Sequence, residues 1–245
     1  MAFKTVFKRY EIKYLITQEQ KKMLLSVMLP YMRPDEYGRT TIRNIYYDTD
    51  SFRLIRDSIQ KPVYKEKLRV RSYKTVDMDD TVFVELKKKY KSVVYKRRIS
   101  LSEGEARAWL NRDISAPVKT QITDEIDYFL NYYGTLAPKV FLSYDREAFY
   151  SNTDEEFRIT FDENILYRTD FLSLSREPFG EIILGEGYSL MEIKTAGGIP
   201  LWLTEVLSKN NIFKTSFSKY GNAYTDILRR SETKETLFKE ETLNV

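Results

Sequence analysis

The stretch "LRVRSYK", residues 68–74, alternates apolar side chains with permanent cations. In an extended chain, successive side chains point to opposite faces of the strand. Leu68 and Val70 would therefore face one side, and Arg69 and Arg71 the other. A single strand of this kind is explained by a basic face in water, because charged residues are usually exposed. The alternation becomes informative because the chain repeats it.

Five further segments carry the same alternation of apolar and ionic side chains. They are "YEIKYLI" (10–16), "TVFVELKKKY" (81–90), "VVYKRRISL" (93–101), "FRITFDE" (157–163) and "LMEIKT" (190–195). The segments come in pairs and runs rather than in strict alternation with helices, which favours an antiparallel sheet. About eight strands and five helices are expected, and this mixture is typical of an α+β fold.

A closed barrel would explain why every one of these strands has an ionic face. Apolar residues such as Ile12, Val84 and Ile159 would pack outward against helices, and the ionic faces would line a polar central tunnel. We therefore predict a closed antiparallel β-barrel with helices packed outside. Residues 1–230 would form a single domain, followed by a charged C-terminal tail at 231–245.

Local signals predict where several helices begin and end. Thr17 with Gln20, and Ser102 with Glu105, have the spacing of a capping box at a helix start. Gly134 follows an amphipathic stretch and is typical of a helix end.

The absence of cysteine and histidine from the 245 residues restricts the chemistry. Disulfides, thiolate zinc sites and histidine-based acid–base catalysis are excluded. The carboxylates, amines, guanidiniums and hydroxyls that remain suit an oxygen-ligated cation such as Mg²⁺ or Mn²⁺. We find no signal-peptide pattern and no run of the roughly 20 apolar residues that cross a bilayer, so we expect a cytoplasmic protein.

Any anion site must come from cations that the fold gathers in one place, because 40 basic and 36 acidic residues leave a net charge of only +4. Inside a barrel, each close like-charge pair would cost about 1–4 kcal/mol. Glu11, Glu85, Asp162 and Glu192 would offset part of this repulsion, and an oligophosphate would offset the rest. The cations expected in the tunnel are Lys13, Arg69, Arg71, Lys87, Lys96, Arg98, Arg158 and Lys194.

Tyrosines interleaved with cations can also indicate nucleic-acid binding by base stacking. Most of the 19 tyrosines lie on the apolar faces of the predicted strands, where core packing explains them. We therefore expect no nucleic-acid partner.

Nine ordered motifs resemble the catalytic domain of the vacuolar transporter chaperone (VTC) family, the polyphosphate polymerases of the CYTH-like triphosphate tunnel metalloenzyme superfamily. The resemblance extends from about Phe7 to Ile227. It rests on "RYEIKY", "IYYDT", "LRVRSY", "VFVELKKK", "YKRRISL", "SYDREAFY", "FRITFDENI", "LMEIKT" and "SFSKY", in that order. It implies a polar triphosphate tunnel.

The resemblance also implies a set of site residues. The implied phosphate ligands are Lys13, Arg69, Arg71, Lys87, Lys96, Arg98, Arg146, Arg158, Lys194 and, at the start of the last helix, Lys219. The residues implied in catalysis are Arg69, Arg71, Lys87, Arg158 and Glu192. Glu192 would bind Mn²⁺ or Mg²⁺, assisted by Glu85 or Glu11.

The implied activity is that of a metal-dependent polyphosphate polymerase, which transfers the γ-phosphoryl group of ATP to a phosphate or polyphosphate acceptor. A triphosphatase that uses water as the acceptor is the alternative, and a non-catalytic module that binds polyphosphate or inositol polyphosphate is another. Triphosphatase relatives typically carry an E-x-E-x-K motif. Arg9 stands where the first glutamate of that motif would be, which favours the polymerase.

Two positions depart from eukaryotic relatives, since Ser216 and Lys89 stand where some of them carry lysine and histidine. The chain also has no membrane segment of its own, so any membrane association would be peripheral and made through a membrane-protein partner.

Overall fold

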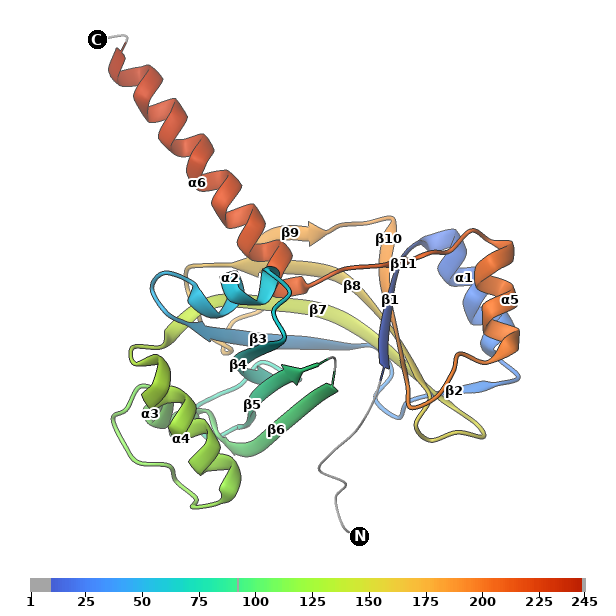
Figure 1. Cartoon of the computed structure of the whole chain (residues 1–245), viewed down its shortest axis with the longest axis horizontal. Helices are drawn as coiled ribbons and strands as arrows, with labels where there is room; N and C mark the ends of the chain where they lie inside the picture. Colours follow the sequence, from blue (N-terminus) through green and yellow to red (C-terminus); the bar gives the residue numbers. More distant parts are fainter. Residues whose placement is uncertain (1–9, 92, 244–245) are drawn as a thin grey trace.

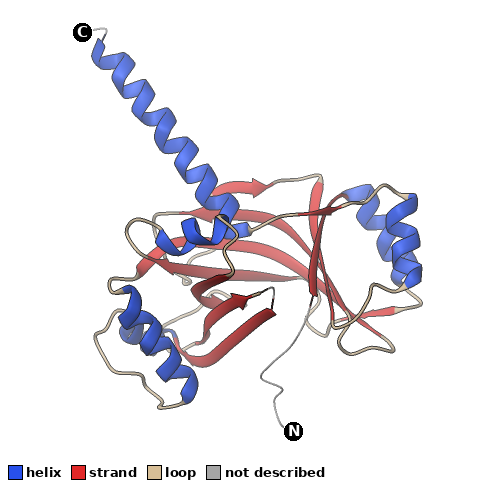
Figure 2. Cartoon of the chain, in the orientation of Figure 1, coloured by secondary structure: helices blue, strands red, loops and turns tan. Residues whose placement is uncertain are grey.

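The computed structural model describes residues 10–91 and 93–243, within which the chain forms eleven strands and six helices (Figure 1). All the strands belong to one sheet, which the helices flank (Figure 2). The strands are β1 (Tyr10–Thr17), β2 (Met32–Pro34), β3 (Thr40–Asp48), β4 (Tyr64–Ser72), β5 (Thr81–Tyr90), β6 (Val93–Ser102), β7 (Ala137–Ser151), β8 (Arg158–Arg168), β9 (Glu181–Leu184), β10 (Tyr188–Thr195) and β11 (Lys214–Thr215). The helices are α1 (Gln18–Met28), α2 (Arg53–Ile59), α3 (Glu103–Leu110), α4 (Gln121–Tyr133), α5 (Leu201–Lys209) and α6 (Lys219–Leu243).

The sheet is antiparallel, with the strand order β11-β1-β10-β8-β7-β3-β4-β5-β6, and with β2 paired to β7 and β9 to β8. The predicted α+β class and antiparallel sheet are confirmed. The predicted closed barrel of about eight strands is wrong in two respects. The described residues form eleven strands, and β6 at one end of the order pairs with neither β1 nor β11 at the other, so the sheet is open.

The segment that leads into α6 contacts both arms of the open sheet, one made of β4, β5 and β6 and the other of β1, β10 and β11. Lys13 of β1 donates a hydrogen bond to the carbonyl oxygen of Phe217 (2.7 Å), and Lys67 of β4 donates one to the hydroxyl of Ser218 (3.3 Å). The backbone of this segment therefore lies between long side chains from both arms of the sheet. β1 and β4 are therefore connected through this segment and not by a backbone ladder, which would require a separation of about 4.8 Å.

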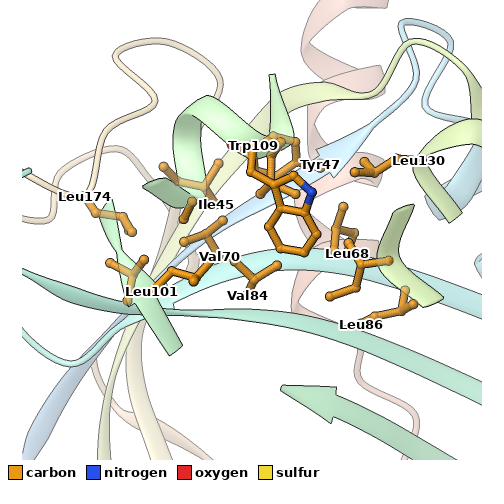
Figure 3. Close-up of a cluster of buried hydrophobic side chains, with 14 of the residues drawn as sticks. Ile45, Tyr47, Leu68, Val70, Val84, Leu86, Leu101, Trp109, Leu130 and Leu174 are labelled. Atoms are coloured by element: carbon orange, nitrogen blue, oxygen red, sulfur yellow. The ribbon is translucent and has the colours of Figure 1, made fainter. Parts of the chain in front are cut away.

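The apolar side of the sheet packs against helices as the alternation predicts. On one arm, Leu68 and Val84 belong to a cluster with Trp109 of α3 (Figure 3). Phe129 of α4 belongs to the same cluster. On the other arm, Ile159 belongs to a cluster that α1 and α5 cover, and Ile12 packs at its margin. At about 25 cal/mol per Å² of apolar surface, this burial is the main stabilising contribution to the fold.

The opposite side of the sheet carries the predicted site residues, and we call it the ionic face. A third apolar cluster, which includes Ile42 of β3, Leu142 of β7 and Tyr220 of α6, packs on part of this side. The prediction that all helices pack outside is wrong for α6, whose first turn lies on this face. Tyr220 of α6 stacks on Tyr46 of β3, with ring centroids 4.5 Å apart. Tyr46 projects to the same side as Asn44, which binds Arg71 on the ionic face. The start of α6 thus lies beside the cations of the ionic face.

The helix signals read from the sequence are largely present. Thr17 and Ser102 form the predicted capping boxes, and Gly134 caps the end of α4. Helix α2 has no such signal, because its N-cap is Phe52 and makes no side-chain cap. Helix α6 continues to Leu243 and extends away from the sheet (Figure 1). Within the described residues, no helix is both long and apolar enough to cross a membrane.

Candidate functional site

The first ionic cluster surrounds Glu85 of β5, whose side chain is only 1% exposed. The antiparallel register places Arg69 of β4 and Arg98 of β6 directly opposite it. Arg69 donates from Nε to Oε2 (2.8 Å), Arg98 donates from Nε to Oε1 (2.6 Å), and the Nζ of Lys96 lies 2.8 Å from Oε1. The Nε of Arg71 lies 3.8 Å from Oε2. One carboxylate therefore gathers four cations.

The pKa of Glu85 follows from this arrangement. Burial alone would raise it, but the charges of the surrounding cations outweigh burial and hold the pKa well below its usual range. The same carboxylate keeps the pKa of Arg69 above its ordinary value, although burial opposes this. Burial lowers the pKa of Lys96 to about 8, against the opposing charge of Glu85, so the cluster carries an excess of positive charge at neutral pH.

The second ionic cluster contains two carboxylates, Asp162 of β8 and Glu192 of β10. Arg146 of β7 binds Asp162 through both Nε (2.6 Å) and Nη2 (2.7 Å). The Nζ of Lys219 lies 2.5 Å from Asp162 Oδ2 and 3.3 Å from Glu192 Oε1. Lys13 lies 3.2 Å from the same Glu192 oxygen. The lysine at the start of α6 therefore bridges two neighbouring strands.

Burial would raise the pKa of Glu192, but the charges of Lys219, Lys13 and Lys194 hold it well below its usual range. The pKa of Asp162 is lowered for the same reason, chiefly by Arg146 and then by Lys219. Both carboxylates are therefore charged at neutral pH, and their field raises the pKa of Lys219 against the effect of burial.

The remaining predicted residues lie between or beside these clusters. Lys87 of β5 reaches across to β1, where its Nζ lies 3.2 Å from Glu11 Oε2. Arg158 pairs with Lys194 in the register of β8 and β10 and lies 3.9 Å from Asp35. The structure therefore brings all the predicted site residues to the ionic face, with Arg158 at its margin.

Three further features of the ionic face were not among the predicted site residues. Lys67 lies two residues before Arg69 on the same side of β4, as the alternation of that strand predicts. The hydroxyls of Tyr46 and Tyr144 accept hydrogen bonds from Arg69 and Arg71, respectively. The parity of "IRNIYYD" and "SYDRE" would have placed both tyrosines on this face.

Burial outweighs the nearby negative charge at two lysines of the ionic face, although the Nζ of one of them, Lys194, lies 3.8 Å from Glu192 Oε2. Burial and the charges of neighbouring lysines lower the pKa of Lys67 to about 7. The pKa of Lys194 is also lowered to about 7, by burial and then by Arg146, against the opposing charge of Glu192. Such values indicate a site where added negative charge would be strongly stabilised.

Asp48, at the end of β3, fixes the start of α6 and therefore the position of Lys219. The carboxylate of Asp48 accepts hydrogen bonds from the backbone N–H groups of Leu54 and Ile55 at the start of α2 (2.9 and 3.1 Å). It also accepts one from the hydroxyl of Tyr220 (2.9 Å). The aspartate of the "IYYDT" motif thus joins β3, α2 and α6.

The carboxylates of the ionic face could hold a divalent cation only together with the phosphate oxygens of a substrate. Among the described residues, no group of three or more acidic side chains is arranged to hold a metal ion. Glu85 and Glu192 lie in separate clusters, and Glu11 pairs with Lys87. Mg²⁺ commonly uses one or two protein carboxylates and completes its shell with substrate phosphates. Glu192, with Asp162 beside it, fits this kind of shared site.

Two surface cavities lie away from the ionic face and share none of its residues. One of about 410 Å³ lies beside Arg112 and Asp127, and one of about 250 Å³ lies beside Tyr31 and Trp202. Neither contains the cation clusters that the sequence predicts.

The described residues thus form an open antiparallel sheet whose ionic face holds two clusters of cations around buried carboxylates. A family model, the VTC domain, matches residues 8–227, so the chain belongs to the VTC domain family. A candidate adenylate cyclase from Bacillus halodurans has a similar structure, with a TM-score of 0.55, 18% identity, and coverage of 87% of this chain and 95% of that one. A second candidate adenylate cyclase, from Vibrio parahaemolyticus, has a TM-score of 0.46, 11% identity, and coverage of 89% and 99%. Comparison with curated proteins found no match.

Proposed function

We propose that this protein is a metal-dependent phosphotransferase of the polyphosphate polymerase type, which moves the γ-phosphoryl group of ATP to a phosphate or polyphosphate acceptor. Membership of the VTC domain family supports the enzyme class. The observation that carries the proposal is the pair of cation clusters on one face of one sheet, around Glu85 and around Glu192 with Asp162. Tyr144 lies between the clusters, because its hydroxyl accepts a hydrogen bond from Arg71 and its ring contacts Arg146 and Lys219, so a linear anion could contact both.

Unsatisfied donors on β8 support the same interpretation. The Nε atom of Arg158 and the hydroxyl of Thr160 are buried and make no hydrogen bond. Both side chains are on the side of β8 that carries Asp162. Buried polar groups normally have partners, so these atoms are suited to donate to a ligand oxygen.

The transfer requires the protein to align the two substrates and to neutralise charge on the transferred group, and it needs no covalent intermediate with the protein. An oxygen of the terminal acceptor phosphate would form a bond to the γ-phosphorus, and the bond from that phosphorus to the β–γ bridging oxygen would break. ADP leaves with the bonding electron pair. The acceptor oxygen is already ionised, so no histidine base is required. Arg69, Arg71, Lys87 and Arg158 would neutralise the charge that develops on the phosphoryl oxygens.

Glu192 would hold the divalent cation, Mn²⁺ or Mg²⁺, together with phosphate oxygens of the substrate. When bound, the cation neutralises charge on the phosphates. Glu192 lies beside a second carboxylate, Asp162, with which it shares Lys219, whereas Glu85 is the single carboxylate of its cluster and Glu11 is paired with Lys87. We therefore assign Glu85 and Glu11 to the positioning of cations.

Hydrolysis of a triphosphate is the alternative reaction, with water in place of the phosphate acceptor. Arg9, which favours the polymerase in the sequence, lies outside the described residues. A binding module for polyphosphate or inositol polyphosphate would need the same cations without turnover.

Incubation of the purified protein with ATP and either Mn²⁺ or Mg²⁺, followed by sizing of the products, separates these functions. We expect ADP and phosphate chains longer than the acceptor supplied. Free phosphate alone would indicate a triphosphatase, and no turnover with tight phosphate binding would indicate a binding module. The matched variants are Arg69→Ala, in the first cluster, and Arg97→Ala, which removes an arginine that binds Glu125 on the other side of β6.

A further inference from the structure

An aromatic pair lies next to the first cation cluster. Tyr73, directly after β4, and Phe83 of β5 are in edge contact, with ring centroids 5.6 Å apart and an interplanar angle of 72°. Phe83 is two residues from Glu85 and opposite Arg71 in the register, so its ring is on the ionic face. The phosphotransfer chemistry described above does not use these rings.

Arg98 joins the aromatic pair to the phosphate-binding cations. Its guanidinium carbon lies 4.5 Å from the centroid of the Phe83 ring. Its Nη2 donates a hydrogen bond to the hydroxyl of Tyr73 (3.0 Å), and its Nε binds Glu85. A fixed guanidinium beside two aromatic rings is a common surface for stacking a planar base.

Exposure distinguishes this pair from the other aromatic residues of the ionic face. Tyr46 and Tyr144 are buried, and their hydroxyls already bind Arg69 and Arg71. Tyr73 is 40% exposed, and Phe83 is partly exposed. Tyr150 is also partly exposed, but it lies against Arg158 at the margin of the ionic face. Beside the first cation cluster, the rings of Tyr73 and Phe83 are the ones that a planar ligand could reach.

The spacing along β4 fits a nucleotide. Tyr73 follows Arg71 by two residues on the same side of the chain, which corresponds to about 7 Å along an extended strand. One ribose can bridge such a separation between a phosphate at Arg71 and a base at Tyr73. The opposite end of the phosphate chain would then point toward the cluster around Glu192.

We propose that Tyr73, Phe83 and Arg98 form a subsite for the base of a nucleoside triphosphate, with its phosphates directed toward Arg71 and Arg69. This inference rests on the proposed function, and it adds the place where the base of the proposed nucleotide donor binds. The Tyr73 hydroxyl is engaged by Arg98. Recognition is therefore by stacking, which every base can provide. ATP and GTP should bind with similar affinities.

Calorimetric titration with ATP and with inorganic tripolyphosphate, in EDTA to prevent turnover, tests the subsite. Tyr73→Ala and Phe83→Ala should each weaken ATP binding about tenfold and change tripolyphosphate binding less than about twofold. Tyr73→Phe keeps the ring and should retain ATP affinity. Tyr128→Ala, which removes an exposed ring from α4, is the matched control and should change neither ligand.

Equal weakening of both ligands, or of neither, would overturn the base subsite while leaving the phosphate site intact. Wild-type protein that binds neither ligand would overturn the proposed function, and the subsite with it. Thermal unfolding of each variant shows whether it is folded at the temperature of the titration.

Discussion

The Nζ of Lys87 lies 3.2 Å from Glu11 Oε2, so a side-chain ion pair joins β5 to β1, two strands that share no backbone hydrogen bonds. Lys87 and Glu11 are 39% and 27% exposed, and ion pairs with this exposure contribute about 0–1 kcal/mol. The pair thus defines how the two arms face each other without being a main source of stability.

We predict opposite effects on phosphate binding when the two partners of this pair are neutralised. Lys87→Met removes a cation from the ionic face and should weaken tripolyphosphate binding. Glu11→Gln releases that cation and should strengthen it. Each variant should lose less than about 1 kcal/mol of unfolding free energy. Calorimetric titration measures the affinity for tripolyphosphate, and urea unfolding measures the free energy of unfolding. The variant with both substitutions gives the interaction energy between Lys87 and Glu11. Equal loss of affinity in the two variants would contradict the prediction.

Neutralising Glu85 should destabilise the free protein strongly. Glu85→Gln leaves four cations without their buried counter-charge, and breaking a buried ionic cluster costs about 3–5 kcal/mol. Tripolyphosphate replaces the missing negative charge, so it should raise the melting temperature of the variant more than that of the wild type. Thermal unfolding with and without ligand is the measurement.

Glu125→Gln provides the matched control for Glu85. Glu125 also binds two cations, Arg97 and Lys88, but on the other side of the sheet and with 23% exposure. Its loss should cost about 1 kcal/mol or less, and tripolyphosphate should not compensate for it. Equal compensation in both variants would mean that the ligand binds elsewhere.

Phosphate binding should depend on pH through Lys67 and Lys194, whose pKa values are lowered to about 7. Both are mostly neutral at pH 8 and mostly protonated at about pH 6. Raising the pH through 7 therefore removes positive charge from the site, and binding of tripolyphosphate should weaken. Binding at pH 8 should also take up protons, because a bound anion raises both pKa values.

Titrations in buffers with different ionisation enthalpies count these protons. Lys67→Met should reduce the uptake at pH 8, whereas Lys88→Met, on the other side of β5, should leave it unchanged. The ligand's own protonation is common to all variants and cancels in the comparison. Proton uptake that is equal in wild type and Lys67→Met would exclude Lys67 as the source.

The strand alternation predicted which side chains of a strand share a face, because this depends only on whether two residues are an even number of positions apart. Arg69, Glu85 and Arg98 could therefore be assigned to one surface from the order of residues alone. Whether the sheet closes depends instead on tertiary contacts. The hydrogen bond from Lys13 to the backbone carbonyl of Phe217, 204 residues away, leaves no signal in a local pattern.

Helix α2 and the start of α6 also depend on contacts between residues far apart in the sequence, which a local pattern does not reveal. The cap of α2 comes from Asp48 on the preceding strand, and not from its N-cap residue Phe52. Tyr220 reaches the same carboxylate from the far end of the chain. The sequence predicts Lys219 at the start of the last helix, but its position between Asp162 and Glu192 depends on this long-range contact.

Metal dependence should be lost when Glu192 is neutralised. Glu192→Gln keeps the shape of the side chain and removes the charge that would hold Mn²⁺ or Mg²⁺, so metal-dependent turnover of ATP should fall at least about 100-fold. The cations remain, so binding of tripolyphosphate in EDTA should persist or strengthen. Asp162→Asn should also lower turnover, because it releases Arg146 and frees Lys219. Added Mn²⁺ should partly restore Glu192→Gln only at concentrations well above those that saturate the wild type. Full metal-dependent turnover in Glu192→Gln would show that the metal is held without this carboxylate.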